Sequence, residues 1–140
     1  MSPRRPDDAP QLIPYLYYPD ATEALDFLVQ AFGFEVKSAL RGEKDEVWTA
    51  QLRTGDGGVV MIGPGMSEFG TRAVEDPDWA TTRMFVYVDG VEAHCERARA
   101  AGATIRSEPA VHSSDNKIYV ASDCGGQQWI FAEPVDGASD

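Results

Sequence analysis

Apolar residues recur at helical spacing in two stretches of the chain. In residues 20–33, DATEALDFLVQAFG, one face collects Ala24, Phe27, Leu28, Ala31 and Phe32. This spacing predicts an amphipathic helix, which Asp20 can cap at its start, with Glu23 three residues later, and which Gly33 can end. Residues 89–102, DGVEAHCERARAAG, have the same length and matching end residues. They predict a second helix of the same kind.

Short runs rich in β-branched and aromatic residues, bounded by Gly, Pro and Asp, predict eight strands. Four lie in the first half, at residues 12–18, 34–40, 46–54 and 58–63, and four in the second, at 83–88, 103–109, 116–122 and 127–134. Between the halves, residues 64–81 lack any period and hold two Gly and two Pro, which predicts a linker or flap.

The chain therefore reads as strand, helix and three strands, twice. The two helices align without a gap, and the glycine pairs 57–58 and 125–126 each precede an apolar strand that ends in proline. This indicates an internal duplication. A sheet with one helix leaves its other face uncovered, so we expect two curved sheets around a cleft that is the natural ligand site. The predicted divisions are a disordered lead (1–10), two units (11–64 and 82–134), a flap (65–81) and a disordered tail (135–140).

Three segments resemble the vicinal oxygen chelate superfamily, which includes glyoxalase I, bleomycin-resistance proteins, fosfomycin-resistance enzymes and extradiol dioxygenases. They are PYLYYPDATEALDFLVQAFGFEV, RMFVYVDGVEAHCERARAAGATI and IYVASDCGGQQWIFAEP. The resemblance covers residues 11 to 134. It implies an α+β fold of two tandem βαβββ units, and in character it is nearest to a metal-free bleomycin-resistance protein.

Most enzymes of that superfamily hold a divalent metal with His, Glu or Gln from four strands. By the resemblance, the matching positions here are Ile13 or Pro14, Met61, Arg83 and Ile130. None of these side chains is a metal ligand, and a fixed guanidinium repels a cation. A shift of one residue does not improve the set, and Gln11 offers a single amide. We therefore predict no metal and no other cofactor.

Strand alternation predicts which side chains face the cleft. The candidate ligand-binding residues are Tyr18, Gln51, Met61, Arg83, Phe85, Tyr87, Lys117, Tyr119, Gln128 and Ile130. Met84, Val86, Val88, Ile118 and Val120 are expected under the helices, and a slip of one residue would exchange the two sets. Such a wall suits a flat or partly anionic organic ligand. The aromatic residues can equally be packing residues, and Arg83 can equally pair with a nearby carboxylate.

No catalytic residue is predicted. We expect His94 on the solvent side of its helix, Cys95 as a packing residue, and Cys124 as an exposed thiol without a neighbour that would activate it. His112, near the cleft mouth, would need an orienting partner such as Asp115 to act as a base. His112 and Glu133 are the first residues to examine if the protein is an enzyme.

The charge narrows the range of partners. Twelve Lys and Arg stand against 23 Asp and Glu, a net charge of -11, which argues against nucleic acid and anionic membranes. No apolar run approaches the roughly 20 residues of a membrane helix, and the start does not resemble a signal peptide. Two cysteines without a zinc-binding pattern favour a reduced, cytoplasmic protein.

The leading hypothesis is a binding protein that sequesters a small organic molecule in an aromatic-lined cleft without metal. The resemblance also implies a homodimer. One alternative is a lyase, isomerase or dioxygenase of the same superfamily. Another is a regulatory or interaction module that uses the flap, with Phe69 and Trp79 as its apolar contacts.

Overall fold

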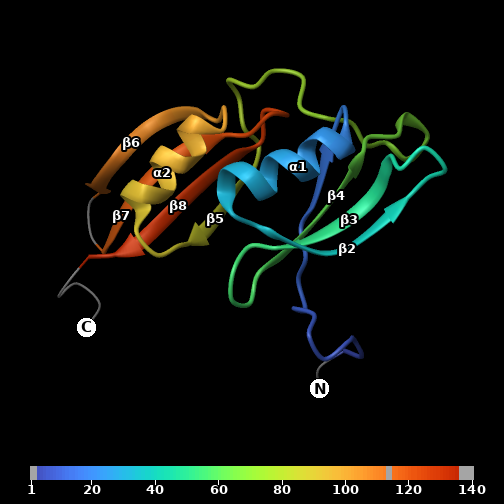
Figure 1. Ribbon diagram of the computed structural model, residues 1–140, viewed down its shortest axis with the longest axis horizontal. Coiled ribbons are helices and arrows are strands. Elements are labelled where there is room, and N and C mark those ends of the chain that lie inside the picture. The colour runs from blue at the N-terminus through green and yellow to red at the C-terminus, as the bar shows by residue number, and fades with distance from the viewer. Residues whose placement is uncertain (1–2, 113–114, 136–140) are drawn as a thin grey trace.

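The computed structural model describes residues 3–112 and 115–135, which form two four-stranded sheets with one helix each (Figure 1). The first unit holds β1 (Tyr15–Tyr18), α1 (Ala21–Phe32), β2 (Glu35–Arg41), β3 (Val47–Arg53) and β4 (Val59–Pro64). A 3-10 turn, η1 (Ser67–Phe69), lies in the linker. The second unit holds β5 (Arg83–Tyr87), α2 (Val91–Ala100), β6 (Thr104–His112), β7 (Asn116–Ser122) and β8 (Gln128–Pro134).

The two sheets have the same topology, which confirms the predicted pair of βαβββ units. Their strand orders are β1-β4-β3-β2 and β5-β8-β7-β6. In each, the first strand runs parallel to the last strand of its unit, and the remaining pairs are antiparallel. The first predicted strand is shorter than expected: residues 12–14 precede β1, and within them the Pro14 carbonyl accepts the N–H of Met61 in β4 at 2.9 Å.

The two helices begin differently, although their sequences align. The Asp20 carboxylate accepts the N–H groups of Thr22 and Glu23 at 3.0 and 3.1 Å, and Gly33 ends α1 at φ 75°, as predicted. In contrast, α2 has Gly90 as its N-cap and no side chain of its own there. Glu133 of β8 accepts the N–H groups of Gly90 and Val91 instead, at 3.2 and 3.3 Å. A carboxylate from a distant strand therefore replaces the local cap.

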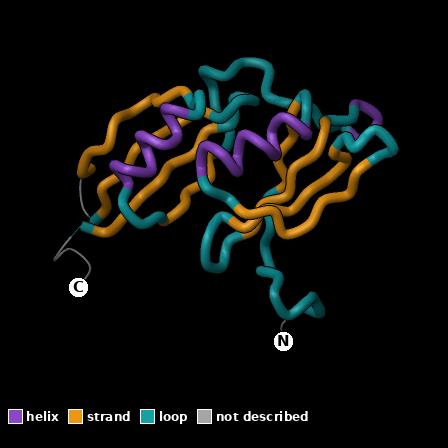
Figure 2. The backbone as a smooth tube through the Cα atoms, in the orientation of Figure 1, coloured by secondary structure: helices purple, strands orange, loops and turns teal. Residues whose placement is uncertain are grey.

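Aromatic side chains of both units share one core. Both helices lie on the same side of the sheets and pack against each other (Figure 2). Beneath them, Phe32 contacts Phe131 with ring centroids 4.8 Å apart, and Phe34 contacts Trp129 at 5.3 Å. Because Phe32 and Phe34 belong to the first unit and the other two to the second, this cluster joins the units across the duplication.

A buried carboxylate joins the same two units. Asp123, in the turn before β8, accepts the phenol of Tyr18 at 2.6 Å and the indole N–H of Trp129 at 2.9 Å on one oxygen. Its other oxygen accepts the backbone N–H groups of Gly125 and Gln127, each at 3.0 Å. Four donors satisfy the carboxylate, as a buried charge requires. Gly125 is needed here, since a Cβ would lie 2.4 Å from the Tyr18 ring.

The linker between the units crosses over the start of β8 and is tied to the second sheet. The carbonyl of Pro77 accepts from Gln128 Nε2 at 3.4 Å and from Arg106 Nη1 at 3.5 Å. Arg106 also pairs with Asp78 at 3.5 Å. This segment is the predicted flap, and in this structure it packs against the second sheet. The predicted disorder of the lead and tail stays a prediction, and residues 136–140 of the tail lie outside the described residues.

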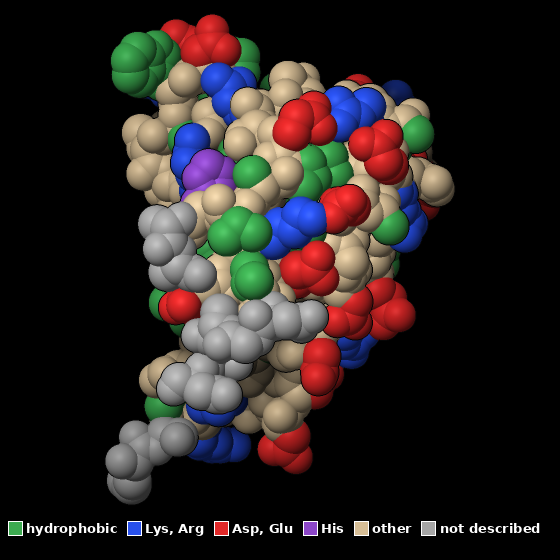
Figure 3. Space-filling view, turned by 90° about the vertical axis from the view of Figure 1, so that its left-hand side faces the viewer, with side chains coloured by type: hydrophobic (Ala, Val, Ile, Leu, Met, Phe, Trp, Pro, Cys, Tyr) green, Lys and Arg blue, Asp and Glu red, His purple; other side chains and the backbone are tan. Residues whose placement is uncertain are grey.

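The surface agrees with the acidic composition. At the end of the molecule that holds β6 and β7, acidic and basic side chains are intermingled and form no continuous basic patch on the visible described residues (Figure 3). None of the helices in the described ranges has the length and apolar character to cross a membrane.

Candidate functional site

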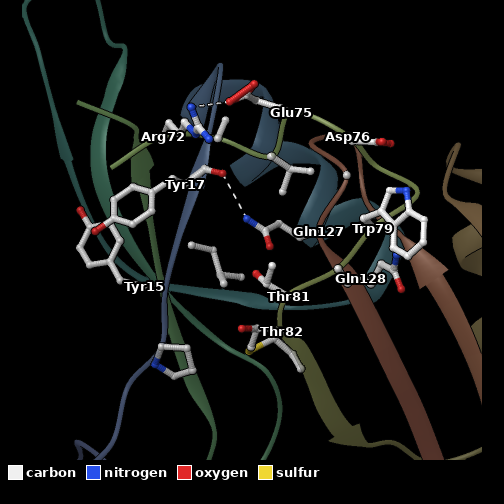
Figure 4. A pocket seen from close by; sticks show the side chains of 17 residues that line it. Tyr15, Tyr17, Arg72, Glu75, Asp76, Trp79, Thr81, Thr82, Gln127 and Gln128 are labelled. Atoms are coloured by element: carbon white, nitrogen blue, oxygen red, sulfur yellow. Dashed lines mark hydrogen bonds and ion pairs between the residues drawn. The ribbon is translucent and has the colours of Figure 1, made fainter. Parts of the chain in front are cut away.

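A groove runs between β1, at the edge of the first sheet, and β5, at the edge of the second. It has two lobes of about 440 and 520 Å³, which share Pro14, Thr82 and Met84 in their walls. The linker covers the first lobe, which is drawn in Figure 4. The second is mostly apolar and includes Leu12, Ile13 and Phe85.

Side chains of both units face each other across the first lobe. Gln127, just before β8, reaches across to β1 and donates to the carbonyl of Tyr17 at 3.3 Å (Figure 4). Trp79 and Gln128 lie on the opposite wall, and Thr81 and Thr82 lie between (Figure 4). Trp79 is 77% exposed, an unusual state for the largest apolar side chain. The groove thus offers aromatic and hydrogen-bonding groups together.

The sheet faces opposite the helices are open, and they carry rows of side chains set by strand register. In the first sheet, Tyr15 lies beside Met61, which lies beside Gln51. The rings of Tyr15 and Tyr17 stack with centroids 4.9 Å apart, and the Tyr15 hydroxyl lies 2.9 Å from that of Thr49. This face therefore presents two ordered phenol rings.

The open face of the second sheet has a similar composition. Phe85 lies beside Ile130, and Arg83 beside Gln128. Phe85 and Tyr87 are 50% and 60% exposed, with ring centroids 5.3 Å apart. Exposed aromatic side chains concentrated on one face mark a binding surface more often than isolated ones do.

Three of the predicted cleft residues lie on the helix side instead. Tyr18 is 1% exposed and bonds Asp123, so its neighbours Tyr15 and Tyr17 take the open face. Tyr119 is fully buried and contacts His94 of α2, and Lys117 pairs with Glu92 of the same helix. The whole of β7 is therefore turned over relative to the prediction, and its Ile118 and Val120 lie on the open side in register with Ala132 and Ile130.

The other seven predicted residues lie on the open faces: Gln51, Met61, Arg83, Phe85, Tyr87, Gln128 and Ile130. Of these, Arg83, Phe85 and Gln128 also line the groove. The sequence prediction missed Tyr15, Thr82 and Gln127 as lining residues. Reading the first strand in the other register, with Tyr18 buried, would have found Tyr15. Thr82 and Gln127 directly precede the predicted residues Arg83 and Gln128, outside the ends of β5 and β8.

Of the residues considered for catalysis, His94 and Glu133 have structural contacts, and His112 lies at the end of β6 beside Asn116, outside the groove lining. His94 is half-buried, and burial lowers its pKa; its Nε2 donates to the Phe32 carbonyl at 3.0 Å, and its Nδ1 accepts from the Tyr119 hydroxyl. The expectation that His94 faces solvent was wrong, because α2 packs against α1. Cys124 is exposed, as predicted, but partial desolvation of its thiol and the neighbouring Asp123 carboxylate raise its pKa to about 12, which leaves it a poor nucleophile at neutral pH. Glu133, as a helix cap, lies away from the groove lining.

The open-face rows do not fit a divalent metal. Register places Tyr15 beside Met61 and Phe85 beside Ile130, and none of these offers an imidazole, thiolate or carboxylate. Among the described residues, one trio of donors does come together: Cys95, Glu96 and Glu108. Both of its carboxylates already pair with Arg99, at 3.2 and 2.6 Å, so a cation occupies that position.

Comparison with known proteins identifies the family. A model of the Glyoxalase/Bleomycin resistance protein/Dioxygenase superfamily matches residues 11–134. The chain belongs to this superfamily. This confirms the resemblance stated from the sequence, over the same residues. An uncharacterized protein of Mycobacterium bovis is 28% identical over 129 residues, 90% of this chain and 84% of that protein.

Several solved structures have the same fold. TioX from a Micromonospora species is 28% identical, with a TM-score of 0.70 over 89% of this chain and 98% of TioX. TnmS3, described as an antibiotic binding protein from a Streptomyces species, is 19% identical, with a TM-score of 0.65 over 86% of this chain and 92% of its own. The fosfomycin resistance protein FosX from Mesorhizobium loti is 13% identical, with a TM-score of 0.63 over 89% and 92%. The last two show the fold alone.

Proposed function

We propose that this protein binds a small organic molecule without metal, in the groove and on the open sheet faces, and thereby sequesters it. One observation carries the proposal. Exposed aromatic rings such as Tyr15 and Phe85 stand beside amide and guanidinium groups, on rows that offer no imidazole, thiolate or carboxylate ligand. The description of the superfamily names resistance proteins beside enzymes, and TnmS3, which has the same fold, is described as an antibiotic binding protein.

A homodimer is part of this proposal. Large apolar side chains remain exposed on the open faces, among them Phe85 at 50% and Tyr87 at 60%. A second copy covering these faces would bury them and close the groove against solvent. Sedimentation velocity should then give about twice the 15.3 kDa mass of the chain.

The two cysteines are unpaired, which fits a reducing, cytoplasmic setting.

Binding is tested with N-phenyl-1-naphthylamine, a neutral aromatic probe whose fluorescence rises in apolar surroundings. We expect saturable binding, weakened about fivefold by Phe85→Ala and by Tyr15→Ala, because each loses one aromatic contact worth about 1 kcal/mol. Phe69→Ala is the matched control, since Phe69 is 73% exposed and lies outside the groove. Absence of saturable binding, or equal losses in all three variants, would overturn the proposal.

Metal analysis separates the binding protein from an enzyme of the same superfamily. The untagged protein should carry no stoichiometric metal and show no heat of binding with zinc, nickel, manganese or ferrous ions. A tight, stoichiometric metal would refute the metal-free site and direct attention to lyase, isomerase or dioxygenase activity.

A further inference from the structure

Arg83 opens β5 at the point where the groove meets the second sheet. Its Nε donates to the amide oxygen of Gln128 at 2.9 Å. Among the described residues, no carboxylate lies within ion-pair distance of Arg83, and its two terminal nitrogens have no hydrogen-bond partner. The sequence left two roles open for Arg83, pairing with a nearby carboxylate or contacting a ligand. The structure favours the second, because the guanidinium has no carboxylate partner among the described residues.

Gln128 holds the guanidinium in a fixed orientation. Its side chain is 3% exposed, and its Nε2 donates to the Pro77 carbonyl of the linker at 3.4 Å. With Nε2 held by Pro77, the amide oxygen accepts from Arg83 Nε, so the bond to Gln128 leaves the two terminal nitrogens of Arg83 for a ligand. A guanidinium that is already positioned loses less side-chain entropy on binding than a free one.

The surroundings of Arg83 leave its charge uncompensated. A hollow of about 490 Å³ adjoins it, lined also by Trp79, Thr81 and Thr82. Arg106 and Asp78 share this lining, but they pair with each other at 3.5 Å, so their charges balance. Within the described part of the chain, neither threonine hydroxyl has a hydrogen-bond partner in the protein. Arg83 is therefore an exposed cation at the groove with unpaired hydroxyl donors beside it.

We propose that Arg83 receives an oxyanion of the ligand, such as a carboxylate or sulfonate, while Trp79 or Phe85 contacts its aromatic rings. This inference rests on the proposed binding function and names the chemical class of the ligand. A guanidinium fork matches two oxygens of such a group with parallel hydrogen bonds, and a nearby hydroxyl can donate a third. The net negative charge of the protein disfavours every anion. A small anion without rings has only the contacts at Arg83 to offset this, whereas an aromatic anion also gains the ring contacts.

A matched pair of probes tests the proposal. 8-Anilinonaphthalene-1-sulfonate has the ring system of N-phenyl-1-naphthylamine plus one sulfonate, so the ratio of their Kd values isolates the oxyanion. Arg83→Gln should weaken sulfonate-probe binding about tenfold, or 1.4 kcal/mol, and change neutral-probe binding less than about twofold. Arg83→Lys keeps the charge but loses the fork, and should fall between. Arg41→Gln is the control, because Arg41 is a β2 residue that pairs with Asp45 outside the groove.

Each outcome bears on a different claim. If Arg83→Gln weakens both probes equally, or neither, while the native protein binds them, the oxyanion site is refuted and the binding function stands. If the native protein binds neither probe, the binding function fails, and this inference fails with it. Circular dichroism and thermal unfolding of each variant exclude misfolding as the cause of a loss.

Discussion

We expect the hydrogen bond between Tyr18 and Asp123 to be one of the main contacts that stabilise the association of the two units. Tyr18→Phe keeps the buried ring and removes only the hydroxyl that donates to the carboxylate at 2.6 Å. Burial and the adjacent carboxylate raise the pKa of Tyr18, so the phenol stays protonated and donates at all ordinary pH values. The substitution therefore deletes one hydrogen bond to a buried charge.

The expected loss of stability depends on the hydrogen bonds that Asp123 keeps in the variant. Asp123 keeps three donors, from Trp129, Gly125 and Gln127, so no group is left entirely without a partner. A hydrogen bond to a charged group contributes about 1.5–3 kcal/mol, and we expect a loss of about 2 kcal/mol in the free energy of unfolding. For a chain of this size that lowers Tm by roughly 6–10 °C. Asp123→Asn should cost more, because an amide N–H₂ cannot accept at one of the two oxygen positions.

Urea unfolding followed by tryptophan fluorescence measures both effects, since the Trp129 indole is one of the donors. Tyr17→Phe is the matched control. Its ring lies on the open face one residue away, its hydroxyl has no hydrogen-bond partner among the described residues, and the variant should change stability by less than about 0.5 kcal/mol. Equal losses of unfolding free energy for Tyr17→Phe and Tyr18→Phe, or no loss for either, would refute the stabilising role of the hydrogen bond between Tyr18 and Asp123.

Two further predictions concern acid stability and helix capping. Because burial lowers the pKa of His94 in the folded state, the unfolded chain binds more protons, so stability should fall as pH drops below about 6.5. His94→Asn should flatten this dependence in urea unfolding between pH 7.5 and 5, and an unchanged dependence in the variant would contradict the role of His94. Glu133→Gln should lower unfolding free energy by about 1 kcal/mol, similar to Asp20→Ala in the cap of α1; a neutral effect in calorimetry would contradict the capping role of Glu133.

The sequence was sufficient for the architecture because the duplication repeats its own signals. Two amphipathic stretches of equal length, each followed by three strands, leave few alternative arrangements. The cap at Asp20 and the end of α1 at Gly33 are local, and both were predicted correctly. The cap of α2 was not predictable in this way, because Glu133 lies more than 40 residues from the helix it caps.

The orientation of individual strands was harder to predict, for a physical reason. In β7, Lys-Ile-Tyr-Val, both faces offer side chains that can be buried, so alternation alone does not choose between them. Tyr119 takes the helix side because His94 accepts its hydroxyl there, and Lys117 follows because Glu92 lies on the same helix. Likewise, Tyr18 is buried by a carboxylate 105 positions away. Partners distant in sequence decided each of these cases.

The turn that contains Asp123 also determines the shape of the groove. One oxygen of Asp123 holds the backbone of Gln127, whose side chain spans to the carbonyl of Tyr17 on β1. The next residue, Gln128, holds Arg83 on one side and the linker on the other. A single turn thus positions the first unit, the linker and the proposed oxyanion receptor relative to one another. Because Gln127 and Gln128 lie at the end of the turn that Asp123 holds, loosening this turn should widen the groove and weaken the contact between Gln128 and Arg83.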